Sequence, residues 1–336
     1  MIFNRRFSAA CFAAFALSAC QTTGSGSGAG GGEEISFQTY TPDGYVQILD
    51  GSYTGEVDEI DGVLRLPEGA EGPVPAVILM HGSGGIRSEI EGSVSDALLE
   101  AGFAAFIVDS FSGRGLSSTG RDQGKLPIPA NVVDGLQALK ALRQRPEIDP
   151  ERVGITGFSR GGIVAMYDAL APIKQAILGD APPFAAYAPV YPGCAMQWDT
   201  VKTVGGPIHF FLGAEDDQTP AANCEITADR MRAQGAQDVS VTVYPDASHQ
   251  FLIPRKSRVS TAATFADCQF EIRDSGLMVY EPLDITSEMG WGPFVRTVFK
   301  DCGKRGFTRG GTPEVRAQAL ADITAFFTRT LKGPTS

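Results

Sequence analysis

The 336-residue chain is poor in histidine, tryptophan and positive charge, and each shortage excludes a kind of function. It has 3 His and 2 Trp, and its formal net charge is −11. Because the chain has no excess of basic residues, it offers no positively charged surface for the phosphate groups of a nucleic acid, so a nucleic-acid partner is excluded. The six cysteines include no C-x-x-C pair, and with so few histidines their spacing suits no zinc site. We therefore expect no metal centre.

Long apolar runs are also scarce, and the clearest lies at the N-terminus. Residues 7–17 are apolar and follow two arginines, but the run is too short for a permanent membrane span. This pattern is typical of a signal peptide over residues 1–19. The sequence LSAC, ending at Cys20, resembles the lipobox of bacterial lipoproteins and implies a lipid on Cys20; plain secretion is the alternative. We expect an exported lipoprotein in the bacterial cell envelope, at the periplasmic face of a membrane, which we take to be the outer membrane.

Residues 20–34 are rich in Gly and Ser, and they predict a flexible tether before a folded domain over residues 35–336. Four cysteines remain once Cys11 and Cys20 are set aside, and four cysteines allow three pairings. Disulfides persist in exported proteins. We predict the two local pairs, Cys194–Cys224 and Cys268–Cys302.

Beyond the tether, buried strands alternate with helices. Short apolar segments predict two leading antiparallel strands, at 46–49 and 62–67, and then strands at 74–81, 104–111, 152–158, 185–191, 207–213 and 239–245. Helical spacing and end signals predict helices at 93–103, 129–145, 161–171, 221–235 and 312–331, with Ser93 and Thr312 as N-caps. This alternation predicts an α/β fold, a mainly parallel sheet with helices on both faces. Ligands of such sheets bind beyond the carboxyl ends of the strands.

The segment GFSRG, residues 157–161, lies between a predicted strand and a predicted helix. A strand that turns sharply into a helix strains the residue between them, and glycines two before and two after it remove Cβ atoms that would collide. The hydroxyl of Ser159 would then stand clear at the top of the sheet. The pattern Gly-x-Ser-x-Gly also arises by chance. The prediction that Ser159 is a nucleophile therefore depends on the position of the pattern between a strand and a helix.

A serine nucleophile needs a base, and the chain has three histidines. His209 lies inside a predicted strand and is expected to pack there, whereas His81 ends a strand and leads into the glycine loop HGSGG. His249 follows the last central strand in a polar turn, so we predict it as the base. The backbone N–H groups of Ser83, in the glycine loop, and Arg160, at the helix start, are the predicted oxyanion donors.

The acid that orients the base should lie between the serine and the histidine in chain order. The segment FFLGAEDDQTP follows a strand directly and offers Glu215, Asp216 and Asp217. The residues by themselves do not choose among these three carboxylates.

From about residue 74 to 331 the chain resembles the dienelactone hydrolase family of α/β-hydrolases. The resemblance is carried by HGSGG, DPERVGITGFSRGG, APVYPGC, LGAEDDQTPAANC and YPDASHQF. It implies an α/β-hydrolase fold and assigns the acid to Asp216, three residues after Gly213 and four before Pro220, with Asp217 as second choice. Characteristic members have a cysteine nucleophile, so Ser159 is a departure, and other esters come into question as substrates.

A second departure is residues 254–306, which lie between the histidine and the last helix. We interpret them as an insertion that either covers the active site or is a surface excursion. The predicted activity is hydrolysis of carboxylic esters or lactones without a cofactor, on small-molecule substrates. A peptidase on the same fold and an inactive lipid-anchored binding protein are the alternatives. Arg114 and Arg121 lie in a loop near the site, where Arg114 could hold a substrate carboxylate or pair with Asp109 or Asp122.

Overall fold

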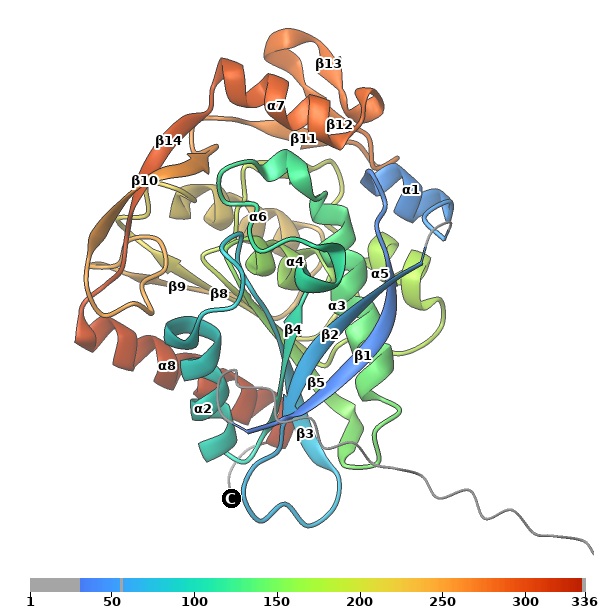
Figure 1. The fold of residues 1–336 in the computed structure, drawn as a ribbon, viewed down its shortest axis with the longest axis vertical. Helices are drawn as coiled ribbons and strands as arrows, with labels where there is room; N and C mark the ends of the chain where they lie inside the picture. Colours follow the sequence, from blue (N-terminus) through green and yellow to red (C-terminus); the bar gives the residue numbers. More distant parts are fainter. Residues whose placement is uncertain (1–30, 55–56, 334–336) are drawn as a thin grey trace, which may run out of the picture. The chain divides into compact units, whose positions relative to one another are not determined.

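An eight-stranded sheet forms the centre of the computed structural model, which describes residues 31–54 and 57–333 (Figure 1). Its strand order is β1-β2-β4-β3-β5-β6-β8-β9. The strands are β1 (Glu33–Tyr40), β2 (Val57–Arg65), β3 (Val74–Met80), β4 (Ala104–Asp109), β5 (Ile148–Phe158), β6 (Ala186–Val190), β8 (Ile208–Gly213) and β9 (Val239–Tyr244). The strands from β4 to β9 in this order are parallel, and β1 and β2 join antiparallel at one edge. The predicted signal peptide, Cys20 and most of the predicted tether lie outside the described residues.

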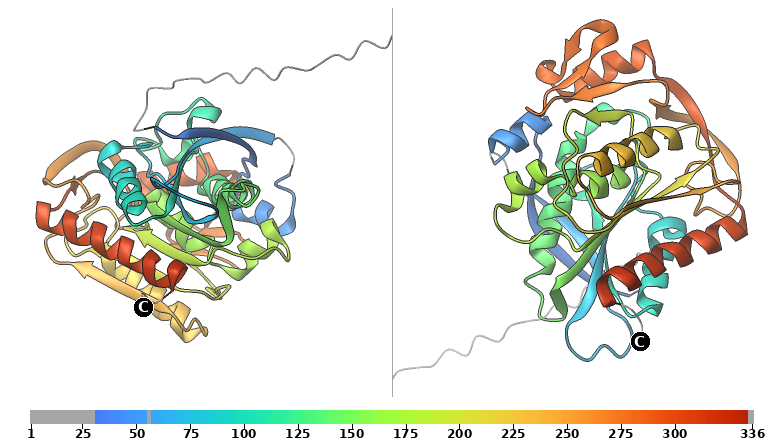
Figure 2. Two further views of the ribbon diagram at one scale, coloured as in Figure 1. Left: turned by 90° about the horizontal axis from the view of Figure 1, so that it is seen from below. Right: turned by 180° about the vertical axis from the view of Figure 1, so that it is seen from behind.

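Helices cover both faces of this sheet, as Figure 2 shows. Two hydrophobic clusters lie on opposite faces of the sheet. In β3, Ile78 and Met80 belong to one cluster, and Val77 and Leu79 belong to the other. The first face carries α3 (Ile128–Leu142), α4 (Arg160–Tyr167), α5 (Ala171–Leu178) and α6 (Ala221–Ala233). The second carries α2 (Ser93–Glu100) and α8 (Pro313–Phe327). Because successive side chains point to opposite faces, a strand buried on both sides is apolar throughout.

The predicted α/β class is confirmed, and so are the central strands, but the N-terminal edge differs from the prediction. Residues 46–49, predicted as a strand, lie in helix α1 (Tyr45–Asp50), which buries Tyr45 and Ile48 on one side. The edge strand is β1 instead, a segment that we did not predict as a strand. A short apolar run does not distinguish a strand from a helical turn, so packing decided here.

The helix boundaries show where local signals succeed and where they fail. Thr312 caps α8 as predicted, because its hydroxyl accepts the N–H of Val315 at 3.2 Å. Ser93 is not an N-cap: a π-helical turn precedes it, and its hydroxyl donates to the Glu89 carbonyl at 2.7 Å. The predicted helix 161–171 ends earlier, because α4 stops at Tyr167, and α5, which begins at Ala171, was not predicted. Further short turns lie at Ser88–Gly92, Ser112–Arg114, Gln123–Lys125, Glu281–Leu283, Ser287–Met289 and Thr328–Lys332.

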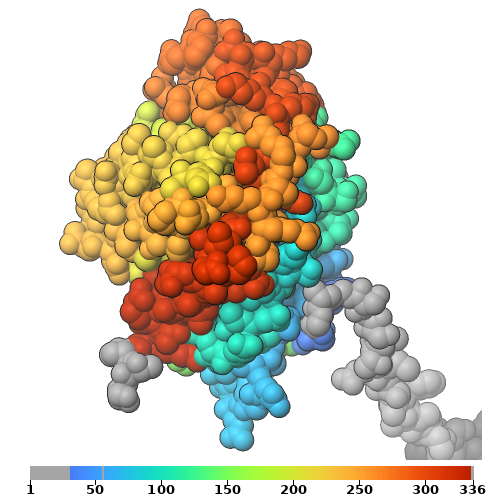
Figure 3. All heavy atoms as spheres, turned by 90° about the vertical axis from the view of Figure 1, so that its left-hand side faces the viewer, coloured from blue at the N-terminus to red at the C-terminus, as the bar shows by residue number. Residues whose placement is uncertain are grey.

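Residues 254–306 form a separate layer at the end of the sheet where its parallel strands end (Figures 1 and 3). Strands β10 (Ser257–Thr264) and β14 (Lys304–Arg309) pair as a ribbon, and β11 (Phe270–Ile272), β12 (Met278–Tyr280) and β13 (Ile285–Thr286) extend a small sheet begun by β7 (Met196–Trp198). Helix α7 (Trp291–Asp301) completes the layer. The chain returns beside the predicted base, because the Gly310 N–H donates to the His249 carbonyl at 2.7 Å.

Candidate active site

Ser159 occupies a strained turn between β5 and α4, where its backbone has φ 57° and ψ −110°. A non-glycine residue rarely adopts such a conformation, and its neighbours show why this turn is tight. A Cβ atom at Gly157 would lie 2.0 Å from the Gly161 carbonyl oxygen, and one at Gly161 would lie 1.9 Å from the Met80 oxygen. Glycine at both positions is therefore a steric requirement of the turn that presents the Ser159 hydroxyl.

The structure brings Ser159, His249 and Asp216 together, although they are far apart in the chain. The Nε2 atom of His249 lies 2.9 Å from the Ser159 hydroxyl, and its Nδ1 atom lies 2.8 Å from Asp216 Oδ2. All three residues are buried, and each follows a strand of the central sheet. With the Nδ1 proton donated to the carboxylate, Nε2 is free to accept the hydroxyl proton.

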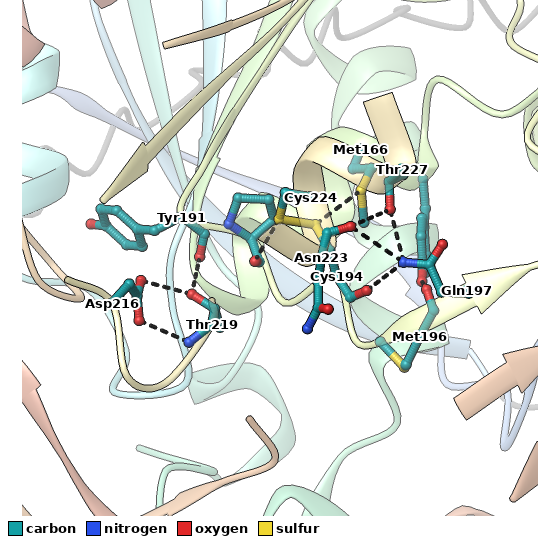
Figure 4. The surroundings of a disulfide bond; sticks show 12 residues. Met166, Tyr191, Cys194, Met196, Gln197, Asp216, Thr219, Asn223, Cys224 and Thr227 are labelled. Carbon is teal, nitrogen blue, oxygen red and sulfur yellow. Dashed lines mark hydrogen bonds between the residues drawn. A yellow bond between two sulfur atoms is a disulfide. The ribbon is translucent and has the colours of Figure 1, made fainter. Parts of the chain in front are cut away.

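Asp216 is held by the first residues of the segment that leads into α6. Its Oδ1 atom accepts the backbone N–H groups of Gln218 and Thr219, at 2.9 and 2.8 Å. The Thr219 hydroxyl lies 2.8 Å from Asp216 Oδ2 and 3.2 Å from the Tyr191 carbonyl oxygen, as Figure 4 shows. These donors fix the orientation of the carboxylate that faces His249.

The predicted oxyanion donors, Ser83 and Arg160, are linked by one side chain. The Gln123 amide lies 3.0 Å from the Ser83 hydroxyl, and its oxygen accepts a bond from Arg160 Nη1 at 2.9 Å. The Ser83 carbonyl in turn accepts the Thr119 N–H at 2.9 Å. Arg160 opens α4, so its own N–H is among those that a helix start leaves without an intrahelical partner. Gln123 thus joins the side chains of two residues that line the same cavity as Ser159.

The guanidinium of Arg160 is buried without a carboxylate partner. Its Nε donates to the Asn131 side-chain oxygen at 2.7 Å, Nη1 donates to Gln123, and Nη2 donates to the Leu126 carbonyl. Burial lowers the pKa of Arg160 to about 9. Through these hydrogen bonds to neutral acceptors, the Arg160 side chain connects α4 to α3 and to the loop before α3.

The other two histidines have local structural partners. His81 is buried, with Nδ1 2.8 Å from the Gly82 carbonyl oxygen and Nε2 accepting the Ser110 N–H at 3.2 Å. Burial lowers the pKa of His81, so the neutral ring is favoured. His209 lies in β8 as predicted, half-buried, with Thr242 and Ser240 as hydrogen-bond partners on β9.

The prediction that Arg114 contacts a substrate is wrong. Its guanidinium is buried and holds both oxygens of Asp134 at 2.8 Å, with Asp58 as a second carboxylate at 3.3 Å. Neither of the carboxylates that we considered, Asp109 or Asp122, is its partner. A side chain committed to a buried bidentate pair is not available to a ligand. The glycine-rich loop therefore turns Arg114 toward α3 and away from the site.

A cavity of about 110 Å³ adjoins Ser159. The residues that line it come from two regions: the central fold, and the insertion layer of residues 254–306. The insertion supplies Ala263, Phe265, Ala266, Phe270, Met278, Trp291 and Val295. This layer therefore covers the site, which was one of the two interpretations left open. Sequence periodicity did not reveal this role, nor that of Gln123, because both depend on contacts between distant segments.

Both predicted disulfides are present. Cys194 pairs with Cys224, which joins the segment after β6 to the first part of α6 (Figure 4). Cys268 pairs with Cys302 within the insertion layer. Among residues 31–54 and 57–333 no group of three or more His, Cys, Asp or Glu side chains could hold a metal ion. No helix in these ranges is both long and apolar enough to cross a bilayer.

The sheet, its covering helices and the strained strand-to-helix turn at Ser159 define the class of α/β-hydrolases. The model of the dienelactone hydrolase family matches residues 60–270. The chain belongs to this family, and it is accordingly a carboxylic ester hydrolase.

Several individual proteins are similar to this chain. "Protein usf" of Aquifex pyrophilus is 28% identical over 195 residues, which cover 55% of this chain and 80% of that protein. A "Putative carboxymethylenebutenolidase" of Salmonella typhimurium is 25% identical over 228 residues, covering 63% and 80%. The match to "Putative hydrolase YtaP" of Bacillus subtilis, 32% identical, spans 31% of this chain and only 41% of that protein. The crystal structure of a "Putative Dienelactone Hydrolase" from Klebsiella pneumoniae shares the fold, with 18% identity, a TM-score of 0.50 and coverage of 88% of this chain and 99% of that one.

Proposed function

We propose that the chain cleaves carboxylic esters or lactones through an acyl-enzyme on Ser159, with His249 as general base and acid and Asp216 as the orienting carboxylate. The observation that carries this proposal is the continuous hydrogen-bonded line from Asp216 through His249 to Ser159, with contacts of 2.8 and 2.9 Å. A hydroxyl is a weak nucleophile by itself, and an adjacent imidazole in the correct tautomer activates it.

In the first half of the reaction, His249 Nε2 takes the proton of Ser159 as Oγ bonds to the substrate carbonyl carbon. The carbonyl electron pair moves to its oxygen, which the N–H groups of Ser83 and Arg160 would stabilise. Collapse of this intermediate breaks the bond to the leaving oxygen, which receives the proton from His249 Nε2. Water then repeats the sequence on the acyl-enzyme and frees the acid and Ser159.

Replacement of the nucleophile tests this proposal. Purified Ser159→Ala should lose at least about 10⁴-fold in kcat on p-nitrophenyl acetate, because nothing else in the line can attack the carbonyl. A fluorophosphonate probe should label the parent protein at Ser159 and leave the variant unlabelled. Hydrolysis by Ser159→Ala at the parent rate would refute the proposal, and so would a parent protein that does not react with the probe.

We also propose that the protein is exported and anchored to a membrane by a lipid on Cys20. The N-terminal pattern of residues 1–20 supports this, and two disulfides are typical of proteins in an oxidising compartment. Cells grown with labelled palmitate should incorporate label into the parent chain and not into Cys20→Ala. Equal labelling of both chains, or of neither, would exclude the anchor.

A further inference from the structure

The cavity beside Ser159 has a polar end, and most of its remaining surface is apolar. Ser83, Gln123 and Ser159 form the polar end, where the carbonyl group of a substrate would lie. The walls from the central fold include apolar side chains such as Ile163 and Met196, and also the polar residues Gln218, Thr219 and Asn223. A cavity of this composition favours an uncharged hydrocarbon group next to the reacting carbonyl.

The insertion layer lines the cavity with large apolar side chains. Phe265, Phe270, Met278, Trp291 and Val295 all line it, and four of them are less than 9% exposed, Phe265 being the exception. These side chains give the insertion layer an apolar surface in the cavity that adjoins Ser159. Each methylene that a ligand buries here is removed from water, which is favourable.

Arg160 is the one charged residue among those that line this cavity. Each of its nitrogen atoms donates a hydrogen bond to a neutral acceptor of the fold, namely Asn131, Gln123 and Leu126. A substrate carboxylate in this cavity would lose its hydration, and the guanidinium, which already donates to three acceptors of the fold, would have two remaining N–H groups to offer it. Burial of an ion on such terms is unfavourable.

The layer is fixed in place before any ligand binds. The Cys268–Cys302 disulfide joins the segment before β11 to the end of α7. The Trp291 indole N–H donates to the Gln123 carbonyl at 2.9 Å, which ties α7 to the loop beside Ser83. The Tyr280 hydroxyl donates to Asp301 at 2.6 Å. A preformed wall selects among substrates by shape and polarity.

The position of His249 decides which half of an ester enters the cavity. Under the proposed function the leaving oxygen must lie within reach of His249 Nε2 to receive its proton. His249 does not line this cavity, which extends from Ser159 toward Met196, Phe270 and Val295. The acyl group, on the opposite side of the carbonyl carbon, is therefore the part that the cavity receives.

We propose that the insertion layer builds an acyl-binding site for uncharged apolar acyl groups, and that it selects such esters against those whose acyl chain ends in a carboxylate. This inference rests on the proposed function of Ser159. It assigns Phe265, Phe270 and Met278 a role in specificity.

A matched pair of substrates tests the selection directly. p-Nitrophenyl pentanoate and the mono-p-nitrophenyl ester of glutaric acid have equally long acyl chains, which end in a methyl group and a carboxylate respectively. We expect kcat/KM for the pentanoate to exceed that for the glutarate by at least tenfold. From acetate to pentanoate, kcat/KM should rise two- to fourfold per methylene, since each buried methylene contributes up to about fourfold. A flat series or a preference for the glutarate ester would overturn the inference.

Variants in the layer locate the effect. Met278→Ala enlarges the cavity and should raise the octanoate-to-acetate ratio of kcat/KM by at least threefold. Ala266→Leu narrows the cavity and should lower the same ratio. Met289→Ala is the matched control on the same layer, because its side chain is 45% exposed and does not line the cavity. If Ala266→Leu folds and leaves the ratio unchanged, the cavity is not the acyl site.

The two proposals fail in different ways. If Ser159→Ala loses acetate hydrolysis but the parent protein shows a flat chain-length series, the proposed function stands and the acyl site is refuted. Unchanged acetate hydrolysis in Ser159→Ala would remove the proposed function itself.

Discussion

Asp216 and Asp217 are neighbours in the chain, but only Asp216 contacts His249. Asp216 is 6% exposed and lies 2.8 Å from the His249 ring, whereas Asp217 is exposed and bonds Arg258 and Thr308 on the β10–β14 ribbon. The two adjacent carboxylates therefore have different roles. Asp216 orients the His249 imidazole, whereas Asp217 connects the loop after β8 to the insertion layer.

This difference yields a matched pair of variants. Asp216→Asn should lower kcat on p-nitrophenyl acetate by about 10³–10⁴-fold, because the amide no longer holds the His249 tautomer that accepts the proton of Ser159. Asp217→Asn should keep kcat within about threefold of the parent value, since it loses an exposed ion pair only. Steady-state kinetics on both proteins check this. Equal losses in the two variants would contradict the assignment of Asp216.

The bridge from Ser83 through Gln123 to Arg160 predicts a positioning effect. Gln123→Ala leaves the Ser83 hydroxyl and Arg160 Nη1 without their shared partner, so the two oxyanion N–H groups lose a restraint. We expect kcat on the acetate to fall about tenfold with little change in KM, because misplaced donors weaken transition-state binding more than substrate binding. Gln144→Ala, at an exposed glutamine outside the site, is the control. A change confined to the melting temperature would indicate a purely structural role.

The two disulfides close loops of similar length and should contribute similar stability. Their half-cystines are 30 and 34 residues apart, so loss of either bridge should cost about 3–4 kcal/mol. Their effects on activity should differ. The pair Cys268→Ala/Cys302→Ala loosens the insertion and should reduce the preference for longer acyl chains while retaining acetate hydrolysis. The pair Cys194→Ala/Cys224→Ala lies beside the Asp216 segment and should lower acetate hydrolysis itself. Urea unfolding and the ester series measure both effects, and identical kinetic profiles for the two variants would contradict the prediction.

Glu91 predicts a pH dependence of stability. Its carboxylate is buried and accepts the Arg87 N–H at 2.7 Å, and burial raises the pKa of Glu91 from 4.5 to about 7. The folded protein therefore binds this proton more tightly than the unfolded chain does, and the contribution of Glu91 to stability decreases as pH rises from 4.5 to 7. Between pH 5.5 and pH 8 the decrease should be about 2 kcal/mol.

Glu91→Gln removes this titration. The free energy of unfolding of the variant relative to the parent should rise by about 2 kcal/mol between pH 5.5 and pH 8, as measured by urea unfolding. Glu89→Gln, on the same turn but exposed, should show no such change. A parent-to-variant difference that stays constant with pH would show that Glu91 does not titrate in this range.

Local patterns in the sequence were sufficient for the central fold and for much of the candidate site. Apolar runs identified the parallel strands because a strand buried on both faces is apolar at every position. The flanking glycines identified Ser159, because the collisions at positions 157 and 161 are a local property of the turn. The residues alone left three carboxylates for the acid, and the family resemblance narrowed them to Asp216. The helix at Tyr45–Asp50 was predicted as a strand, because a short apolar segment fits either element, and the first strand was not predicted.

The sequence by itself determined the strand–helix alternation, the turn that exposes a serine hydroxyl and the chain order of serine, carboxylate and imidazole. Only the tertiary structure decided that Arg114 pairs with Asp134, that Gln123 joins Ser83 to Arg160, and that residues 254–306 wall the cavity. The physical reason is the sequence separation over which each kind of interaction acts. Periodicity and turn chemistry act over a few residues, whereas these contacts join segments about 20 to 170 positions apart, and their partners are chosen by packing and by the need to satisfy buried polar groups.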